Sequence, residues 1–168
     1  VPDGTVPRVR DREVVDLLTQ QGSLDFAPSS QYYYSNSAYA VLAIIVEEIS
    51  GLTFEEFLKK RIFQPSSMNH TVALVAGINT VPSRAMGHTV ENGNIEETDQ
   101  SDFSAVLGDG GIYSSLQGLT AWAQQDYGKQ LLSPASYEAI FIADRENYGL
   151  GWRIDEFSGQ VRYHHSGS

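Results

Sequence analysis

The sequence predicts a mixed α/β (α+β) fold, with a mostly helical region over residues 1–147 followed by two antiparallel strands within residues 148–168. Two observations favour it. Residues 38–46 are uninterrupted apolar residues that continue a polar, tyrosine-rich segment, which is typical of a buried helix. After residue 147 the pattern changes to short runs of aromatic and β-branched residues around a Ser-Gly pair, which is typical of a hairpin.

Composition limits the function classes. A chain of 168 residues, 41% hydrophobic and 19% charged, suits one folded domain with a core. Its net charge of −10, without a basic run, argues against nucleic acid or an anionic membrane as a partner. The apolar run is shorter than the roughly 20 residues that span a bilayer. The absence of cysteine excludes disulfides and thiol catalysis, and we recognise no signal peptide.

The first predicted helices follow from capping residues. Residues 1–10 are a loop, and Asp11 is the predicted cap of a helix over residues 12–19. A second helix, residues 37–50, is apolar nearly all round at its start and is expected at the centre of the helical core, with Gly51 as its C-terminal cap. Thr53 and Glu56 match a capping box that opens a third helix, which ends near Pro65.

The middle of the chain is rich in loops. Asn92-Gly93 predicts a small hairpin over residues 86–97. A glycine-rich turn follows at residues 107–115. Ser114 and Gln117 match a second capping box, which predicts a helix through Ala123.

The last third combines a short helix with the hairpin. Ser133-Pro134 predicts a cap and first turn of a helix to about Ile140. The predicted strands are residues 148–155 and 160–165, joined by residues 156–159. A lone hairpin is marginally stable, so we expect these strands to belong to a larger sheet.

No self-contained catalytic unit is present in the sequence. No serine lies in Gly-x-Ser-x-Gly, and no lysine follows a serine by three positions, so the Ser-x-x-Lys pair is absent. The four histidines (His70, His88, His164, His165) lack metal-binding spacing, and neighbouring strand residues face opposite sides of a sheet. We therefore predict no metal and no cofactor.

Several stretches, in order along the chain, carry a family resemblance. They resemble the penicillin-recognising serine hydrolases, meaning class C β-lactamases, D-alanyl-D-alanine carboxypeptidases and their esterase and peptidase relatives. The ordered set is more specific than any one motif. The matching stretches are Pro28–Ala43 with Tyr34-Ser35-Asn36 as Tyr-x-Asn, Ile49–Pro65 with Met68–Thr71, Gly108–Trp122, Tyr148–Trp152, and His165-Ser166-Gly167 as His-x-Gly.

The resemblance implies a β-lactamase/transpeptidase-like fold and roles for a few residues. Tyr34 would help move the nucleophile's proton, which needs a phenol pKa lowered from about 10 by a nearby cation. Asn36 would hydrogen-bond the family lysine or the substrate amide. His165, on the strand beside the pocket, would orient the substrate or its leaving group. Gly167 would leave room for an acyl group, and the N–H of Ser168 would be an oxyanion-hole donor.

The chain departs from the family pattern at its ends and in one loop. The resemblance puts the nucleophilic Ser and its Lys upstream of Val1 and the last strands downstream of Ser168, while Ser66-Ser67 replaces an expected Leu-Gly. We therefore predict that the whole protein hydrolyses an ester, lactam or amide bond of a small molecule or peptide through an acyl-enzyme. We predict no acyl-enzyme activity for this chain alone.

Alternative interpretations remain open. Ser35 or Asn36 would serve equally as a simple helix cap. Of the two neighbouring histidines, His164 is assigned to solvent, and Asp109 has no serine to pair with as a triad acid. The chain would also suit a non-catalytic binding module that associates with itself or a partner through an open sheet edge. The resemblance suggests a periplasmic or extracellular protein, with the cytoplasm kept open.

Overall fold

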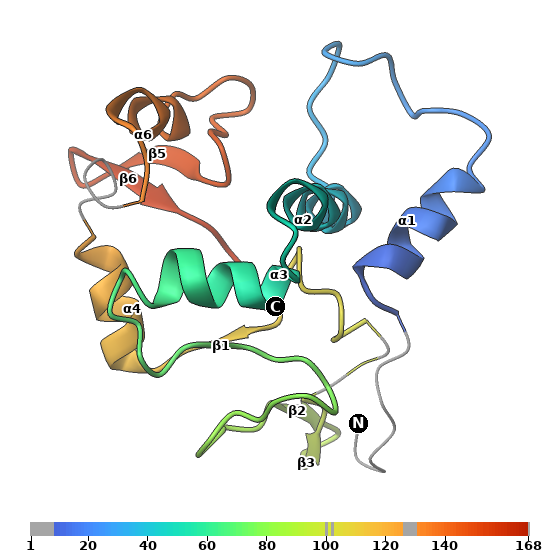
Figure 1. Cartoon of the computed structure of the whole chain (residues 1–168), viewed down its shortest axis with the longest axis vertical. Helices are drawn as coiled ribbons and strands as arrows, with labels where there is room; N and C mark the ends of the chain where they lie inside the picture. The colour runs from blue at the N-terminus through green and yellow to red at the C-terminus, as the bar shows by residue number, and fades with distance from the viewer. Residues whose placement is uncertain (1–8, 100, 102, 126–130, 168) are drawn as a thin grey trace. The chain divides into compact units, whose positions relative to one another are not determined.

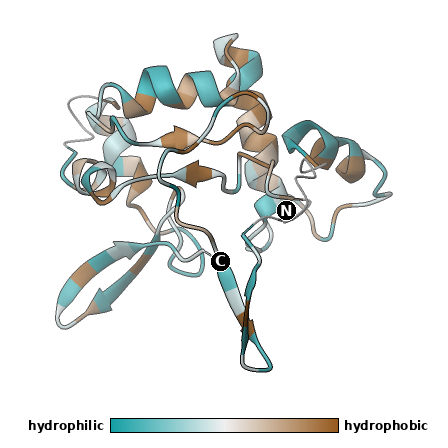
Figure 2. Ribbon diagram, turned by 90° about the horizontal axis from the view of Figure 1, so that it is seen from below, coloured by the Kyte–Doolittle hydropathy of each residue, from teal (hydrophilic) through white to brown (hydrophobic). Residues whose placement is uncertain are grey.

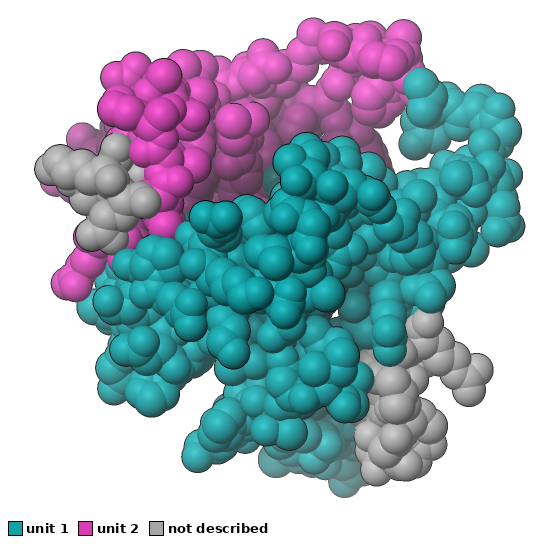
Figure 3. Space-filling model, in the orientation of Figure 1, with its two compact units in different colours: residues 1–25, 34–123 teal, residues 26–33, 124–168 magenta. Residues whose placement is uncertain are grey.

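The computed structural model describes residues 9–99, 101, 103–125 and 131–167 (Figure 1). The chain forms two units, shown in different colours in Figure 3. Unit 1 comprises residues 1–25 and 34–123, and unit 2 comprises residues 26–33 and 124–168. The described part of each unit contains helix and antiparallel strands, which confirms the mixed class.

Helix α2 (Asn36–Ser50) begins one residue earlier than the sequence predicts. Its cap is Ser35, whose hydroxyl accepts a hydrogen bond from the Ala38 N–H at 3.2 Å. Gly51 ends it with a φ of 68°, as predicted. Only one face is buried, through Ala40, Ala43 and Ile44. The expected place at the centre of the helical core therefore holds for one face only, because the other face exposes apolar side chains, including Leu42, Ile45 and Ile49.

Helix α1 (Asp11–Thr19) is capped by Arg10, so the predicted cap at Asp11 is wrong. The Glu13 carboxylate accepts the Arg10 N–H at 3.0 Å and so satisfies the start of the helix. The Asp11 carboxylate, which is buried, instead accepts the N–H groups of Leu107 and Gly108 at 2.9 and 2.8 Å. The Asp11 carboxylate thus hydrogen-bonds the distant backbone at Leu107 and Gly108 and does not cap its own helix.

The third predicted helix is two segments, α3 (Phe54–Phe57) and the π-helical η1 (Leu58–Phe63). Thr53 caps α3, as predicted, by accepting the Glu56 N–H at 3.2 Å. The boundary between the two segments is the change from the α-helical hydrogen-bond pattern to the π-helical one, in which each bond spans one residue more. This region contributes to the hydrophobic core cluster of unit 1. The buried members of the cluster are Phe63, Met68 and Ala73, and the partly buried side chains packed against them are Leu58, Ile62, Ala121 and Trp122.

Two antiparallel strand pairs lie in unit 1. The hairpin β2 (His88–Glu91) with β3 (Asn94–Glu97) is confirmed, and Asn92 and Gly93 both have positive φ, 52° and 82°, as its two-residue turn requires. The pair β1 (Val72–Ala73) and β4 (Ile112–Tyr113) was not predicted. Two residues are too few to show a strand period in the sequence.

Helix α4 (Leu116–Ala123) is confirmed, but its predicted cap is wrong by one residue. Ser115, and not Ser114, accepts the Gly118 N–H, at 3.1 Å. The Ser114 hydroxyl lies 2.7 Å from that of Thr71 in the loop before β1.

Unit 2 carries α6 (Pro134–Ile140) and the hairpin of β5 (Arg153–Phe157) and β6 (Gln160–His164). Ser133 caps α6 by accepting the Ser136 N–H at 3.2 Å, as predicted. The predicted hairpin has the wrong limits. The turn is Ser158-Gly159, both at positive φ, and the chain before β5 forms a tight turn in which the Gly149 N–H donates to Trp152. Figure 2 shows both hairpins with hydrophilic and hydrophobic residues mixed.

Among the described residues, no single helix has the length and apolar character to cross a membrane, although α2 with α3 and η1, bent by 73°, meets the length and composition test as a pair. The same residues contain no cluster of three or more His, Asp or Glu side chains that would hold a metal ion.

Candidate functional site

The segment Tyr34-Ser35-Asn36 lies at the start of α2. Ser35 uses its hydroxyl to cap the helix, which fixes the backbone on both sides of it. The Tyr34 ring packs against the Tyr39 ring, one turn along the helix, with centroids 5.8 Å apart. Asn36, the first residue of the helix, is exposed. Both predicted residues are therefore held on one rigid helix start.

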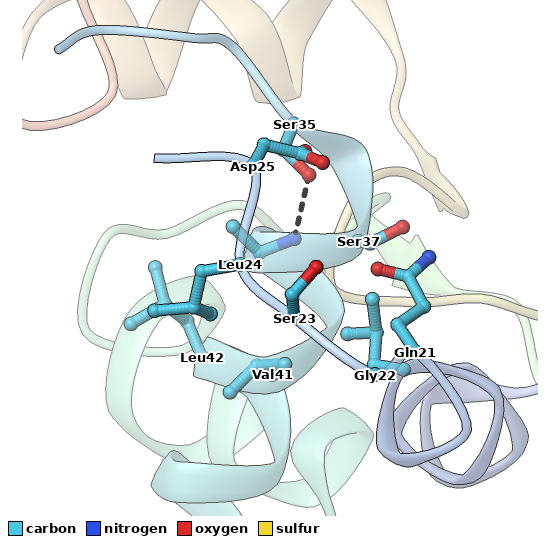
Figure 4. A pocket seen from close by; sticks show the side chains of 11 residues that line it. Gln21, Gly22, Ser23, Leu24, Asp25, Ser35, Ser37, Val41 and Leu42 are labelled. Carbon is cyan, nitrogen blue, oxygen red and sulfur yellow. Dashed lines mark hydrogen bonds between the residues drawn. The ribbon is translucent and has the colours of Figure 1, made fainter. Parts of the chain in front are cut away.

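A cavity of about 500 Å³ opens beside Asn36. Its walls are apolar side chains from α1 and the loop before the glycine turn, and its polar groups include Asn36, Ser37 and Asp109. A second cavity, of about 700 Å³, shares some of this lining and continues along α2 (Figure 4). Val41 and Leu42 line it from α2, and residues 21–25 line it from the segment after α1. The lining residues common to both cavities are Leu18, Gln21 and Ser37.

The glycine turn brings Asp109 to this cavity. A Cβ at Gly108 would collide with the carbonyl oxygen of Tyr39 and lie 2.8 Å from the Ala40 Cα, so only glycine allows this approach to α2. Asp11 holds the same turn through two backbone N–H groups. Partial burial raises the pKa of the Asp109 carboxyl, and the negative charge of Asp11 raises it further.

In unit 2, His165 is held by two contacts. Its Nδ1 lies 2.6 Å from the Ser166 carbonyl oxygen, and its Nε2 lies 2.9 Å from the Tyr148 hydroxyl. A carbonyl oxygen only accepts, so Nδ1 carries the proton and, in the neutral ring, Nε2 accepts from Tyr148. The Tyr148 ring also packs edge-on against the imidazole, with centroids 5.8 Å apart.

Two predictions about the histidines are wrong. β6 ends at His164, so His165 lies just beyond the strand and not on it. His165 is also the more exposed of the two, whereas His164 is half-buried and lies 3.1 Å from the Asp155 carboxylate. The Asp155–His164 pairing keeps the ring of His164 against the hairpin.

The remaining predicted residues are Gly167 and Ser168. A Cβ built at Gly167 would meet no atom within 4 Å, so there is open space at this position. Ser168 lies outside the described residues. Tyr34 and Asn36 belong to unit 1, and His165 and Gly167 belong to unit 2.

The sequence pattern did not indicate Tyr148 or Asp11, two residues whose contacts position the candidate site residues. Tyr148 contacts His165, and Asp11 fixes the turn that carries Asp109. An acid at a helix start, such as Asp11, usually indicates a helix cap, so its position in the sequence gives no sign of a long-range contact.

Comparison with curated proteins identifies relatives that are longer than this chain. Over 94% of its length the chain is 30% identical to penicillin-binding protein 4* of Bacillus subtilis, of which the match covers 39%. It is 28% identical to a D-aminopeptidase of Brucella anthropi, over 90% of the chain and 30% of that protein. The chain thus spans well under half the length of these relatives.

Solved structures with the same fold were also found. The octameric penicillin-binding protein homologue from Pyrococcus abyssi matches 98% of the chain with a TM-score of 0.83 and 24% identity, over 40% of that protein. The D-amino acid amidase from Ochrobactrum anthropi matches 96% of the chain with a TM-score of 0.74 and 18% identity, over 50% of that protein. These likenesses confirm the β-lactamase/transpeptidase-like fold. The family described as Beta-lactamase matches residues 2–168, and the chain therefore belongs to the Beta-lactamase family of serine hydrolases.

Proposed function

We propose that this chain is the Tyr-x-Asn and His-x-Gly portion of a serine hydrolase that cleaves an amide, peptide, ester or lactam bond through an acyl-enzyme. The observation that carries the proposal is the capped start of α2, where Ser35 is committed to the cap and Tyr34 and Asn36 flank it. One similar protein is named D-aminopeptidase and one similar structure is that of a D-amino acid amidase, and both names support cleavage of a bond to a carbonyl carbon.

The proposed reaction has two steps. A serine supplied by residues outside this sequence attacks the substrate carbonyl carbon, and Tyr34 receives its proton and passes it to the leaving amine or alcohol. Water then attacks the acyl-enzyme, releasing the acid and restoring the serine hydroxyl. Asn36 orients the substrate amide, and His165 orients the substrate or its leaving group.

Covalent labelling tests the proposal. The whole protein should react with a fluorophosphonate probe, and this chain alone should not, because no Ser-x-x-Lys pair is present in it. In the whole protein, Tyr34→Phe should slow labelling by about 100-fold or more, the usual contribution of general acid–base catalysis. Tyr33→Phe is the matched control, because Tyr33 is the neighbouring tyrosine and is 76% exposed.

Two results would count against the proposal: covalent label on this chain alone, or equal labelling of the whole protein and its Tyr34→Phe variant.

The alternative function is a non-catalytic module that associates through a sheet edge. Exposed apolar side chains on β5 and β6 favour it: Phe157 and Val161 are each 63% exposed. In the described part of the chain, β6 pairs only with β5, which leaves its other edge open to a further strand. A whole protein that associates but resists the fluorophosphonate would support this alternative.

A further inference from the structure

We propose that the cavity beside Asn36 is a subsite for a cationic group of the substrate, such as a protonated amine, with the Asp109 carboxylate as its counter-ion. The inference rests on the proposed function, because it names the substrate class of that same site. It gives a role to Asp109, which has no serine to pair with as the acid of a catalytic triad.

The cavity has the shape and lining of a small-molecule site. Its volume of about 500 Å³ lies within the usual range for ligand pockets, and apolar walls surround a few polar groups. Asn36, with its amide, and Asp109, with its carboxylate, both line this cavity. A substrate that fills this cavity with its amide at Asn36 would therefore have another of its groups near Asp109. The apolar lining residues are Val14, Leu17, Leu18, Phe103 and Val106.

The charge in this region is of one sign. No Lys, Arg or His is among the described residues that line this cavity or the adjoining one, and their charged lining residues are Asp109 and Asp25. Among the described residues, no cationic side chain pairs with Asp109, and the hydrogen bond to its carboxyl comes from the backbone. Burial raises the pKa of the Asp109 carboxyl and the charge of Asp11 raises it further, while a backbone hydrogen bond partly offsets the two effects. A bound cation would stabilise the Asp109 carboxylate, whereas a substrate carboxylate would be repelled.

The backbone that carries Asp109 is fixed before a substrate arrives. Gly108 packs directly on the backbone of α2, and Asp11 accepts the N–H groups of Leu107 and Gly108. The Asp109 backbone is thus tied to the helix that carries Asn36. Little ordering is then required on binding, which favours selectivity.

Kinetics with matched substrates tests the proposal in the whole protein. The substrates are the p-nitroanilide of an amino acid with a free α-amine and its N-acetylated form, which is neutral. Asp109→Asn should lower kcat/KM for the free amine about tenfold, the size of one partly screened ion pair. It should leave the acetylated substrate within about twofold, and Asp109→Glu should restore much of the preference.

Glu96→Gln is the matched control, because Glu96 is an exposed acid on β3 and outside the cavity. It should leave the ratio of the two substrates unchanged. Equal losses for both substrates in Asp109→Asn, or an unchanged ratio, would overturn the proposal.

A binding measurement separates this inference from the proposed function. Calorimetry with 2-phenylethylamine and its N-acetyl form needs no turnover. Amine binding that weakens about tenfold in Asp109→Asn, in a protein that resists fluorophosphonate, would support the cationic subsite and overturn the serine hydrolase. Fluorophosphonate labelling with no preference for the amine would overturn the subsite and keep the hydrolase.

Discussion

The hydroxyl of Tyr148 lies 2.9 Å from Nε2 of His165, so a residue before β5 holds a residue just after β6. With Nδ1 directed at the Ser166 carbonyl oxygen, both ring nitrogens of His165 have partners within unit 2. The ring's tautomer and orientation are therefore set by the protein. A histidine fixed in this way is suited to positioning a substrate group.

Tyr148→Phe should loosen His165 without removing it. The ring keeps its Nδ1 contact but loses the donor at Nε2, so we expect ¹⁵N NMR of His165 to show a changed Nε2 signal as water replaces the hydroxyl. In the whole protein kcat should fall about tenfold, as a modest loss of positioning would give. Tyr163→Phe on β6 is the control and should change neither measurement. Unchanged Nε2 signals in Tyr148→Phe would contradict the contact.

Asp11→Asn should destabilise unit 1 by weakening the anchor of the glycine turn. The carboxylate accepts two backbone N–H groups, and an amide presents only one oxygen to them. Losing a hydrogen bond to a charged group costs about 1.5–3 kcal/mol in the free energy of unfolding. Urea denaturation measures it. Asp16→Asn, on an exposed position of the same helix, should cost little, and an equal loss in both variants would show that the anchor is unimportant.

Gly108→Ala should also destabilise the chain, because the new methyl group would collide with the backbone of α2. Overpacking of this kind costs about 1–3 kcal/mol, which thermal or urea unfolding would measure. Gly110→Ala in the same turn is the control, since its Cβ would meet nothing within 4 Å. Two variants of equal stability would mean that the turn moves away from α2 at little cost.

The β5–β6 hairpin should lose stability in acid. The Arg162 side chain hydrogen-bonds Asp155 at 2.8 and 2.7 Å and lowers its pKa to about 2, with His164 adding to the effect. A lowered pKa means that the carboxylate stabilises the folded hairpin above the ordinary value of 3.8. That contribution is lost as the pH falls from 3.8 towards about 2.

Asp155→Asn should remove this pH dependence. Cross-strand NMR contacts between β5 and β6, followed from pH 5 to about pH 2, would measure it. The wild-type contacts should weaken in this range, and those of Asp155→Asn should stay level. Glu156→Gln, at the next and exposed position of β5, should behave like the wild type. A level wild-type profile would contradict the prediction.

The sequence by itself determined the elements whose causes are local. Gly51 ends α2, Asn92-Gly93 makes the β2–β3 turn, and Ser133-Pro134 starts α6. Each depends on residues a few positions apart, where backbone sterics and capping hydrogen bonds act. The family could also be recognised from the sequence, because its motifs occur in order along the chain.

Only the tertiary structure decided which distant groups meet. Asp11 was predicted as a cap and instead binds a backbone segment 96 and 97 residues away, while Ser114 contacts Thr71 and leaves the cap to Ser115. His165 lies beyond its strand and contacts Tyr148, and Asp109 shares a cavity with Asn36. The physical reason is that a carboxylate or hydroxyl accepts a nearby or a distant N–H equally well, so only packing selects between them.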